Sequence, residues 1–375
     1  MAKTKEKNNN DNVFHLKSRK AHHVKIVVEE DVSVEGQTNF FEYFDIIPSA
    51  IPDIDFEEVS TETKFLGKTF SAPILIAGMT GGYPEAKKIN QAIAEVCQDL
   101  NIPMGVGSQR AMLADPSLVE TFDVKKFAPD VFLIGNIGLV QLNYGYGVDD
   151  AQRAVDLINA DAIAVHVNAF QELMQPEGDT NFKGLWEKME EICKTLSVPV
   201  IGKEVGSGMS WQDVLRMQEA GCSAVDVGGA GGTSWPKIEI LRHVEEKTKK
   251  KAGKPLPLND PLLKWGVPTA LATWEATTKT NIPIISTGGM YHPLSAAKAL
   301  LMGAKMVGIA RPVLKILIEK GKEGVKEYLE EYILNVKRIM FLVGAKNIEQ
   351  MTSMKWRLVP WGRAKDWLEV RKLLL

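Results

Sequence analysis

Short apolar runs alternate with longer stretches of helical spacing through the middle of this chain. The runs show little alternation of polar and apolar residues, as expected of parallel strands that are covered on both faces. Each run closes on Gly, Ser, Thr or Asn, which are residues that favour turns. The eight predicted strands are Ile74–Ala77, Met104–Val106, Val131–Ile134, Ala162–Val165, Val200–Lys203, Ala224–Val227, Ile284–Ser286 and Met306–Ile309.

Amphipathic stretches follow these strands. Pro84–Leu100 has Pro in its first turn and places Ile89, Ile93 and Val96 on one stripe, which predicts a helix. Similar stripes occur at Asp149–Asn159, Trp186–Leu196, Trp211–Ala220 and Pro293–Leu301. Eight strand–helix units with right-handed crossovers predict an α/β fold, the (β/α)8 TIM barrel. A doubly wound open sheet has the same alternation and is the structural alternative, although the strand count favours the barrel.

The length of 375 residues is compatible with one barrel domain. We predict a flexible tail over residues 1–12, since its Lys- and Asn-rich composition buries too little surface to offset the entropy of ordering. A single barrel domain is expected over residues 13–375. The sixth and seventh strands are separated by roughly 50 residues, which predicts an insertion at about 234–280 that is a functional lid or partly disordered.

Charge and cysteine content narrow the possible partners and the compartment. The formal charge of −2 provides no positive field for binding nucleic acid or an anionic membrane surface. The N-terminus lacks the apolar core of a signal peptide, and no apolar run is long enough to cross a bilayer. Cys97, Cys193 and Cys222 are far apart in the sequence, and we expect reduced structural thiols in a cytoplasmic protein.

Glycine-rich turns follow the last three predicted strands. They are Gly228–Ser234, Thr287–Met290 and Gly308–Pro312, and the last two lead into helices that begin with Pro. Barrel enzymes often bind a phosphate where the loops after strands seven and eight meet a helix N-terminus, because backbone N–H groups converge there. One such turn is often only a tight connection, but three at consecutive strand ends predict a phosphate site.

Small residues and amide donors also follow the first three strands, in Gly78–Gly82, Gly107–Arg110 and Gly135–Gly138. This rim suits a flat polar heterocycle such as the isoalloxazine ring of a flavin, which needs polar groups at one edge and small residues against its faces.

The fourth strand ends in a concentration of polar side chains. His166, Asn168, Gln171 and Glu172 follow an apolar strand, and the group indicates a functional site more strongly than any member alone. A carboxylate beside a polyphosphate suggests a hard divalent cation, for which we choose Glu172.

Lys203 ends the fifth strand, where an unpaired buried charge would be costly. We therefore expect Lys203 to face a ligand anion or a flavin. Glu204 is the alternative partner, but strand alternation directs the two side chains to opposite faces.

These segments together resemble the type 2 isopentenyl diphosphate isomerases over about residues 13–345. The segments that carry the resemblance are Ser18–His23, Met79–Gly82, Gly107–Arg110, His166–Glu172, Lys203–Gly206 and Gly229–Thr233. The resemblance implies the interconversion of isopentenyl and dimethylallyl diphosphate. It also implies reduced FMN as the acid–base cofactor, Mg²⁺ on the diphosphate, NADPH as the reductant and a homotetramer or larger homo-oligomer.

The resemblance assigns roles to individual residues. Gln171 would lie beside the alkene as the catalytic side chain, and Glu172 would hold the metal. The residues expected to bind the substrate are Arg19, Lys20, His23, Arg110, His166, Asn168 and Gln171. Those expected to contact FMN are Met79, Thr80, Gly81, Ser108, Asn136, Lys203, Thr233, Gly288, Gly289, Ala310 and Arg311. One departure is that Gly288-Gly289-Met290 stands where much of the family has a Gly-Xaa-Arg turn.

Other flavin proteins remain as alternatives. An FMN-dependent oxidoreductase of the 2-hydroxy acid oxidase type shares the barrel, but neither His243 nor His292 begins the His-Gly-Xaa-Arg segment of that class. An IMP dehydrogenase-like enzyme needs a nucleophilic Cys after the sixth strand, whereas Cys222 precedes it. A flavin-binding sensor would have no use for the polar groups after strands four and five.

Overall fold

The structure is a computed structural model that describes residues 19–246 and 256–374. The predicted tail at 1–12 and residues 247–255 of the predicted insertion lie outside the described residues. Eight parallel strands form a closed barrel in which β11 pairs back onto β4, so the barrel prediction is confirmed and the open sheet is wrong. The strands are β4 (Ile74–Ile76), β5 (Met104–Gly105), β6 (Leu133–Gly138), β7 (Ala162–Val167), β8 (Val200–Glu204), β9 (Ala224–Asp226), β10 (Ile284–Thr287) and β11 (Met306–Ile309).

The predicted strand limits differ most at β6 and β7. Both strands continue beyond their apolar runs, because the ladder between them extends through the Gly138–His166 pair. Asn136 therefore belongs to β6 and His166 to β7, although the pattern of apolar residues had placed both beyond the strand ends. Backbone pairing between neighbouring strands does not require apolar side chains, so this extension left no trace in the hydrophobic pattern.

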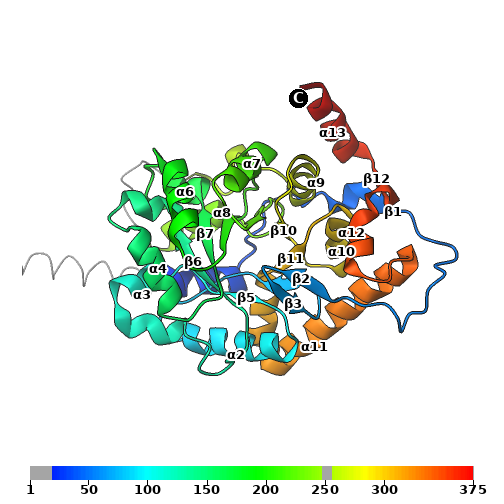
Figure 1. The fold of residues 1–375 in the computed structure, drawn as a ribbon. Helices are drawn as coiled ribbons and strands as arrows, with labels where there is room; N and C mark the ends of the chain where they lie inside the picture. Colours follow the sequence, from blue (N-terminus) through cyan, green and yellow to red (C-terminus); the bar gives the residue numbers. More distant parts are fainter. Residues whose placement is uncertain (1–18, 247–255, 375) are drawn as a thin grey trace, which may run out of the picture.

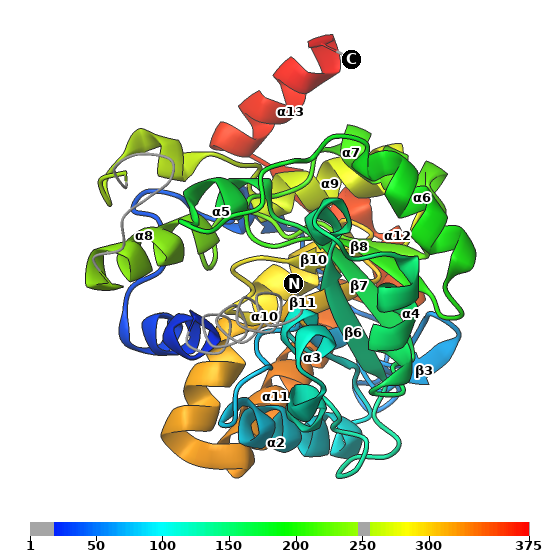
Figure 2. The ribbon, with the colours of Figure 1, turned by 90° about the vertical axis from the view of Figure 1, so that its left-hand side faces the viewer.

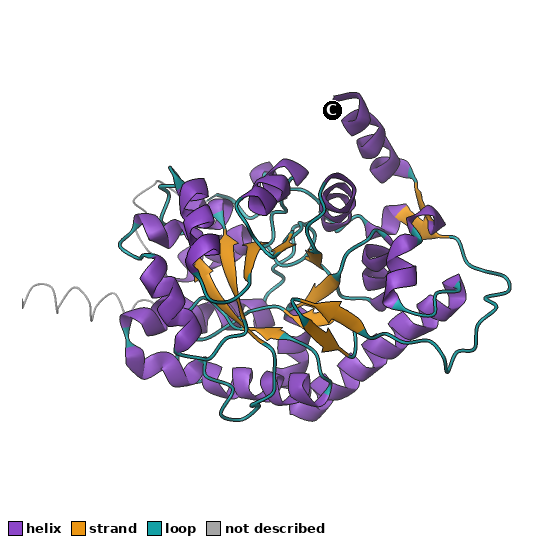
Figure 3. Ribbon diagram, in the orientation of Figure 1, coloured by secondary structure: helices purple, strands orange, loops and turns teal. Residues whose placement is uncertain are grey.

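Helices surround the strands, as Figure 3 shows with helices in purple and strands in orange. Each predicted helix is present within a few residues of its expected limits. The helices of the outer layer are α2 (Ala86–Asp99), α3 (Arg110–Ala114), α4 (Val148–Asp156), α5 (Ala169–Met174), α6 (Leu185–Thr195), α7 (Trp211–Glu219), α8 (Trp235–Glu246), α9 (Thr269–Lys279), α10 (Pro293–Leu301) and α11 (Arg311–Val343). The 3-10 helices are η1 (Phe41–Tyr43), η2 (Pro116–Thr121), η3 (Leu139–Asn143), η4 (Pro261–Lys264) and η5 (Lys355–Arg357). Among the described helices, none is both long and apolar enough to cross a membrane.

A hairpin covers the amino ends of the barrel strands. It consists of β2 (Thr63–Phe65) and β3 (Lys68–Phe70), which pair antiparallel. Phe65 and Phe70 are buried with the apolar side chains of the barrel interior, and the Phe70 ring meets Phe132 edge-on with ring centres 5.4 Å apart. The hairpin fills this end of the barrel, so a ligand site is left to the carboxyl ends of the strands.

An N-terminal helical segment, residues 19–29, lies at the carboxyl ends of the strands beside α8 and the start of α11 (Figure 2). Ile26 and Val27 are buried against Ile238 of α8 and Leu314 of α11. The Arg311 guanidinium donates to the Val27 carbonyl at 3.1 Å and to a second carbonyl, that of residue 30, at 2.7 Å. Apolar packing and this Arg thus fix the segment at the mouth of the barrel.

The predicted insertion at about 234–280 includes two long helices among its described residues. Its last part is α9, which packs beside α7 and against β10 and is the regular barrel helix between β9 and β10. The added element is α8, which packs on α5. The helical stripe of α9 was hard to read because seven of its eleven residues are buried, including Thr269, Thr273 and Glu275. Whether the segment acts as a lid stays a prediction.

The C-terminal part returns to the start of the chain. β12 (Leu358–Pro360) pairs antiparallel with β1 (Phe44–Ile46), and α12 (Ile348–Ser353) packs against α10. The last helix, α13 (Gly362–Leu374), extends away from the barrel in Figure 1. All three cysteines are free thiols, yet the Cys193 and Cys222 sulfurs lie 3.7 Å apart despite their distance in the sequence.

Candidate active site

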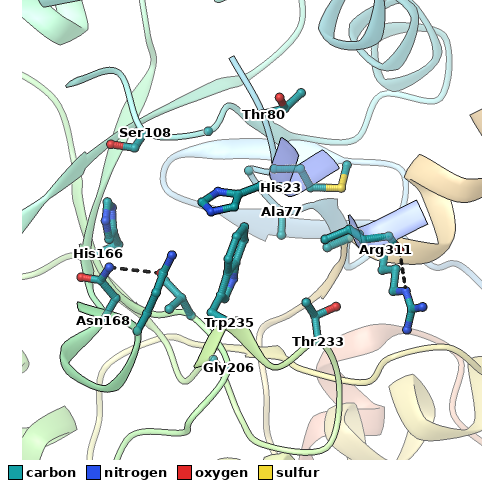
Figure 4. A pocket seen from close by; sticks show the side chains of 18 of the residues that line it. His23, Ala77, Thr80, Ser108, His166, Asn168, Gly206, Thr233, Trp235 and Arg311 are labelled. Atoms are coloured by element: carbon teal, nitrogen blue, oxygen red, sulfur yellow. Dashed lines mark hydrogen bonds between the residues drawn. The ribbon is translucent and has the colours of Figure 1, made fainter. Parts of the chain in front are cut away.

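A pocket opens at the carboxyl ends of the barrel strands, and its space, including the part open to solvent, is about 1560 Å³. Figure 4 shows His23 next to the Trp235 indole, with His166 and Asn168 on one side and Thr233 and Arg311 on the other. Every residue that the sequence assigned to the site lines this pocket, with the exception of Gly81. They are Arg19, Lys20, His23, Met79, Thr80, Ser108, Arg110, Asn136, His166, Asn168, Gln171, Glu172, Lys203, Thr233, Gly288, Gly289, Ala310 and Arg311.

Two of the residues that the sequence assigned to the cofactor, Gly81 and Arg311, have further structural roles, and their contact with FMN stays a prediction. Gly81 has a φ of +148°, and a Cβ there would lie 2.0 Å from the Phe122 ring. Only glycine therefore allows the loop after β4 to pack this closely against Phe122. Arg311 does line the pocket, but its guanidinium is bound to backbone carbonyls at the end of the N-terminal helical segment. Its side chain therefore anchors that segment at the edge of the pocket.

Three cations line one wall of the pocket. Arg19 and Lys20 come from the N-terminal helical segment, and Arg110 comes from the start of α3. Lys20 donates to the Ser108 carbonyl, and its ammonium lies 5.1 Å from the centre of the Phe122 ring. Arg110 at the start of α3 donates to Asp179 at 2.8 Å. Burial lowers the pKa of Lys20 well below its usual value, and the neighbouring charges of Arg19 and Arg110 lower it further. Such mutual repulsion is relieved by a bound anion, so this wall suits a phosphate or diphosphate.

His166 near the end of β7 is the next polar side chain at the pocket. The His166 Nδ1 atom lies 2.8 Å from the Asn136 Oδ1 atom, which is an acceptor, so the ring donates from Nδ1. Burial, together with the charges of Lys203, Arg110 and Lys20, lowers the pKa of His166 to about 3. His166 is therefore a neutral imidazole at physiological pH.

Lys203 has a partner that the sequence did not reveal. Its ammonium lies 2.5 Å from a carboxylate oxygen of Asp226 on β9, and both side chains are buried. Asp226 thus supplies the counter-charge that a buried Lys203 needs, and Lys203 also lines the pocket, where the expected contact with a ligand anion or a flavin stays a prediction. Glu204 points away as expected, since its carboxylate accepts N–H bonds from Gly206 at 2.6 Å and from residues 207 and 208. Burial raises the pKa of Glu204 to about 7 against these donors.

The side chains at the start of α5 form a connected polar group. The Asn168 amide donates to Gln171 at 3.2 Å and to Glu172 at 3.0 Å. The other Glu172 oxygen accepts the Asp179 backbone N–H at 2.7 Å, and burial raises the pKa of this carboxyl. Among the residues that line the pocket, Glu172 is the one carboxylate. Gln171 in turn donates to Glu239 of α8 at 2.9 Å.

Glu239 and Trp235 are two further residues of this site that the sequence did not reveal, and both lie on α8. Glu239 is fully buried and accepts from Arg242 at 3.0 Å, while His23 lies 3.1 Å from its other oxygen. Burial raises the pKa of Glu239, but the charges of His23, Arg242 and Arg19 outweigh it and lower the pKa to about 2. The His23 ring meets the Trp235 indole edge-on at 5.3 Å. The local pattern of α8 carries no sign of these contacts, because they join segments distant in the sequence.

The glycine-rich turns after β9 and β10 leave backbone groups and a hydroxyl at the pocket. A Cβ at Gly288 would lie 2.1 Å from the Gly229 carbonyl, so the turn after β10 is pressed directly against the loop after β9. The buried Thr287 hydroxyl lines the same part of the pocket and has no hydrogen-bond partner among the described residues. Bare backbone and a free hydroxyl are the groups that a phosphate needs. Within the described ranges, no group of three or more His, Cys, Asp or Glu is arranged to hold a metal by itself.

Comparison with known proteins agrees with this geometry. A family described as FMN-dependent dehydrogenase matches residues 15–115 and 148–357. A solved chimera of (S)-mandelate dehydrogenase has a TM-score of 0.62 at 17% identity and covers 91% of each chain. Flavocytochrome b2 with sulfite bound has a TM-score of 0.61 at 19% identity, covering 89% of this chain and 82% of its own. The fold and the site therefore define an FMN-dependent (β/α)8 barrel.

Curated relatives place the chain more narrowly within this class. The isopentenyl-diphosphate delta-isomerase of Pyrococcus furiosus is 42% identical over 360 residues, which is 94% of this chain and 89% of the relative. That of a Synechocystis species is 42% identical over 90% of this chain and 94% of the relative. The chain belongs to the isopentenyl-diphosphate delta-isomerase family.

Proposed function

We propose that this enzyme interconverts isopentenyl diphosphate and dimethylallyl diphosphate with reduced FMN and Mg²⁺. The observation that carries the proposal is the cationic wall of Arg19, Lys20 and Arg110, which shares one pocket with the FMN-type glycine turns. A diphosphate at this wall directs the short hydrocarbon of the substrate toward the space that remains above the flavin site.

The cationic wall supplies binding energy remote from the reacting carbons. Charge-assisted hydrogen bonds from Arg19, Lys20 and Arg110 hold the diphosphate, and the neutral rings of His23 and His166 line the same pocket without further charge repulsion. Asn168, directed by its bonds to α5, faces the same space. Binding energy used here orients the alkene for proton transfer.

FMN would be held at both ends of the pocket. Its phosphate fits the turns at Gly288 and Gly289 with Thr233 and the backbone of Ala310 and Arg311. The ring is left to Met79, Thr80, Ser108, Asn136 and Lys203, all of which also line the pocket. When bound and reduced, for which we propose NADPH as the electron source, the flavin supplies an electron-rich group with exchangeable protons.

Gln171 is our candidate for the side chain beside the alkene. Its amide is held from two sides, by Asn168 and by Glu239, so its position is well defined. We expect Gln171→Ala to lower kcat while FMN affinity stays within twofold of the parent. A matched control is Gln152→Ala on α4, whose amide bonds are on the protein surface. Unchanged turnover in Gln171→Ala would remove this assignment.

Glu172 is our candidate for Mg²⁺ binding. Each of its oxygens accepts one hydrogen bond, and a carboxylate offers about four lone-pair sites, which leaves capacity for a hard cation. With a single carboxylate at the pocket, the remaining ligands come from the diphosphate and water. Glu172→Gln should therefore raise the Mg²⁺ concentration needed for half-maximal activity at least tenfold. An unaltered Mg²⁺ requirement would contradict this role.

The decisive experiment separates an isomerase from an FMN-dependent oxidoreductase, which the similarity to mandelate and flavocytochrome enzymes keeps as the alternative. Purified protein is incubated with isopentenyl diphosphate, FMN, NADPH and Mg²⁺, and each component is omitted in turn. Dimethylallyl diphosphate formed only with reduced flavin supports the proposal. Flavin reduction by isopentenyl diphosphate, or by a 2-hydroxy acid, would support the oxidoreductase instead.

Location and assembly complete the proposal. A cytoplasmic protein is supported by the free thiols of all three cysteines.

We propose a homotetramer or larger homo-oligomer, which light scattering of the purified protein tests directly. A monomeric mass at working concentration would exclude it.

A further inference from the structure

The buried pair of Lys203 and Asp226 joins two adjacent strands at the floor of the pocket. The two residues are paired in register across β8 and β9, and their charged atoms are 2.5 Å apart. Only Lys203 of the two lines the pocket. Asp226 lies behind it with 3% of its surface exposed, so this carboxylate contacts a ligand only through Lys203.

Asp226 is itself held in place. Its second carboxylate oxygen accepts the backbone N–H of Gly228 at 3.1 Å. An ammonium has three N–H donors, of which Asp226 takes one. The carboxylate thus fixes the direction of the Lys203 chain, and the remaining donors are left for the pocket.

Among the described residues beside Lys203 in the barrel, neither His166 nor Glu204 takes the place of Asp226 as a counter-charge. On one side, His166 pairs in register with Lys203 and is neutral at physiological pH. Glu204 points to the opposite face of β8 and is bound to its own loop. A long flexible side chain loses its preferred position when its fixed partner is removed, and the cost is the entropy of ordering it again.

We propose that Asp226 is a positioning residue, which holds Lys203 so that its ammonium donates a hydrogen bond to the polar edge of the flavin ring. The inference rests on the proposed binding of FMN. Asp226 makes no contact with the cofactor in this arrangement and acts entirely through Lys203.

The test is a double-mutant cycle read by FMN affinity, without turnover. FMN fluorescence quenching gives the dissociation constant for the parent protein, Asp226→Ala, Lys203→Met and the double variant. We expect Asp226→Ala to weaken FMN binding about tenfold, which corresponds to about 1.4 kcal/mol for one lost hydrogen bond. In the Lys203→Met background, the same substitution should change FMN affinity less than twofold.

The alternative is that Asp226 acts on the cofactor through the glycine loop, by way of its bond to Gly228. Then Asp226→Ala would weaken FMN binding equally in both backgrounds, and our inference would be overturned. No effect in the parent background would also overturn it. Asp226→Asn keeps an acceptor for Lys203 and should recover most of the affinity. Asp226→Leu removes the acceptor at a similar side-chain volume, and it serves as the test variant if Asp226→Ala does not fold. Asp149→Ala, an exposed Asp on α4, is the matched control.

Failure of this inference is distinguishable from failure of the proposed function. If the parent protein binds no FMN, both are overturned. If the parent binds FMN and isomerises the substrate but the cycle shows no coupling between residues 203 and 226, only the role of Asp226 is lost.

Discussion

Replacing Glu239 by Gln tests the buried network that joins α8, α5 and the N-terminal helical segment. The carboxylate is fully buried and contacts Gln171, His23 and Arg242. Because burial lowers the pKa of His23, this ring is neutral at pH 7. Near pH 7, the favourable charge interactions of the Glu239 carboxylate therefore come from Arg242 and Arg19.

The size of the effect follows from the pKa of Glu239, which falls from 4.5 to about 2 in the folded protein. At 1.36 kcal/mol per unit, this difference corresponds to roughly 3 kcal/mol of stability. A depressed carboxyl pKa contributes its full stability above pH 4.5, and the contribution is lost as the pH falls toward about 2. We expect Glu239→Gln to lose roughly 2 kcal/mol near pH 7, which is less than the full value because the neutral His23 ring contributes no charge there.

Urea unfolding of the parent and the variant, near pH 7 and again near pH 3, measures this difference. The gap in unfolding free energy should narrow at the lower pH, while the exposed control Glu327→Gln on α11 shows no gap at either pH. Because Gln171 and His23 lose their charged anchor, KM for the substrate should rise. FMN affinity should hold, since the two pocket residues that Glu239 contacts, Gln171 and His23, belong to the proposed substrate site. Equal stability at pH 7, or a gap independent of pH, would refute this reasoning.

Three further substitutions test separate parts of the site. Arg110→Ala removes one charge-assisted hydrogen bond and should raise KM for the diphosphate about 10- to 100-fold with FMN affinity unchanged, whereas the exposed Arg338→Ala should be silent. Gly288→Ala forces a Cβ to 2.1 Å from the Gly229 carbonyl at a φ of +121° and should weaken FMN binding more than tenfold, as fluorescence titration can show. His166, whose pKa is lowered from 6.5 to about 3, should cost about 1.4 kcal/mol of stability per pH unit as the pH falls through that window; His166→Gln should flatten that slope in urea unfolding.

The buried pair of Lys203 and Asp226 shows which part of the site the sequence could predict and which part it could not. Lys203 was expected to need a counter-charge, and this was correct. Asp226 is the counter-charge because the β8–β9 ladder pairs it with Lys203. This register cannot be predicted from the sequence of either strand alone.

The sequence by itself determined the eight strands and the order of the polar and glycine-rich segments that follow them, because hydrophobic periodicity and turn chemistry are local properties. Closure of the barrel then gathered those segments at one mouth, as expected. Only the tertiary structure decided that Arg311 holds the N-terminal helical segment and that Glu239 on α8 anchors Gln171. These contacts join parts of the chain that local pattern cannot relate, since burial and register arise only when the whole barrel has formed.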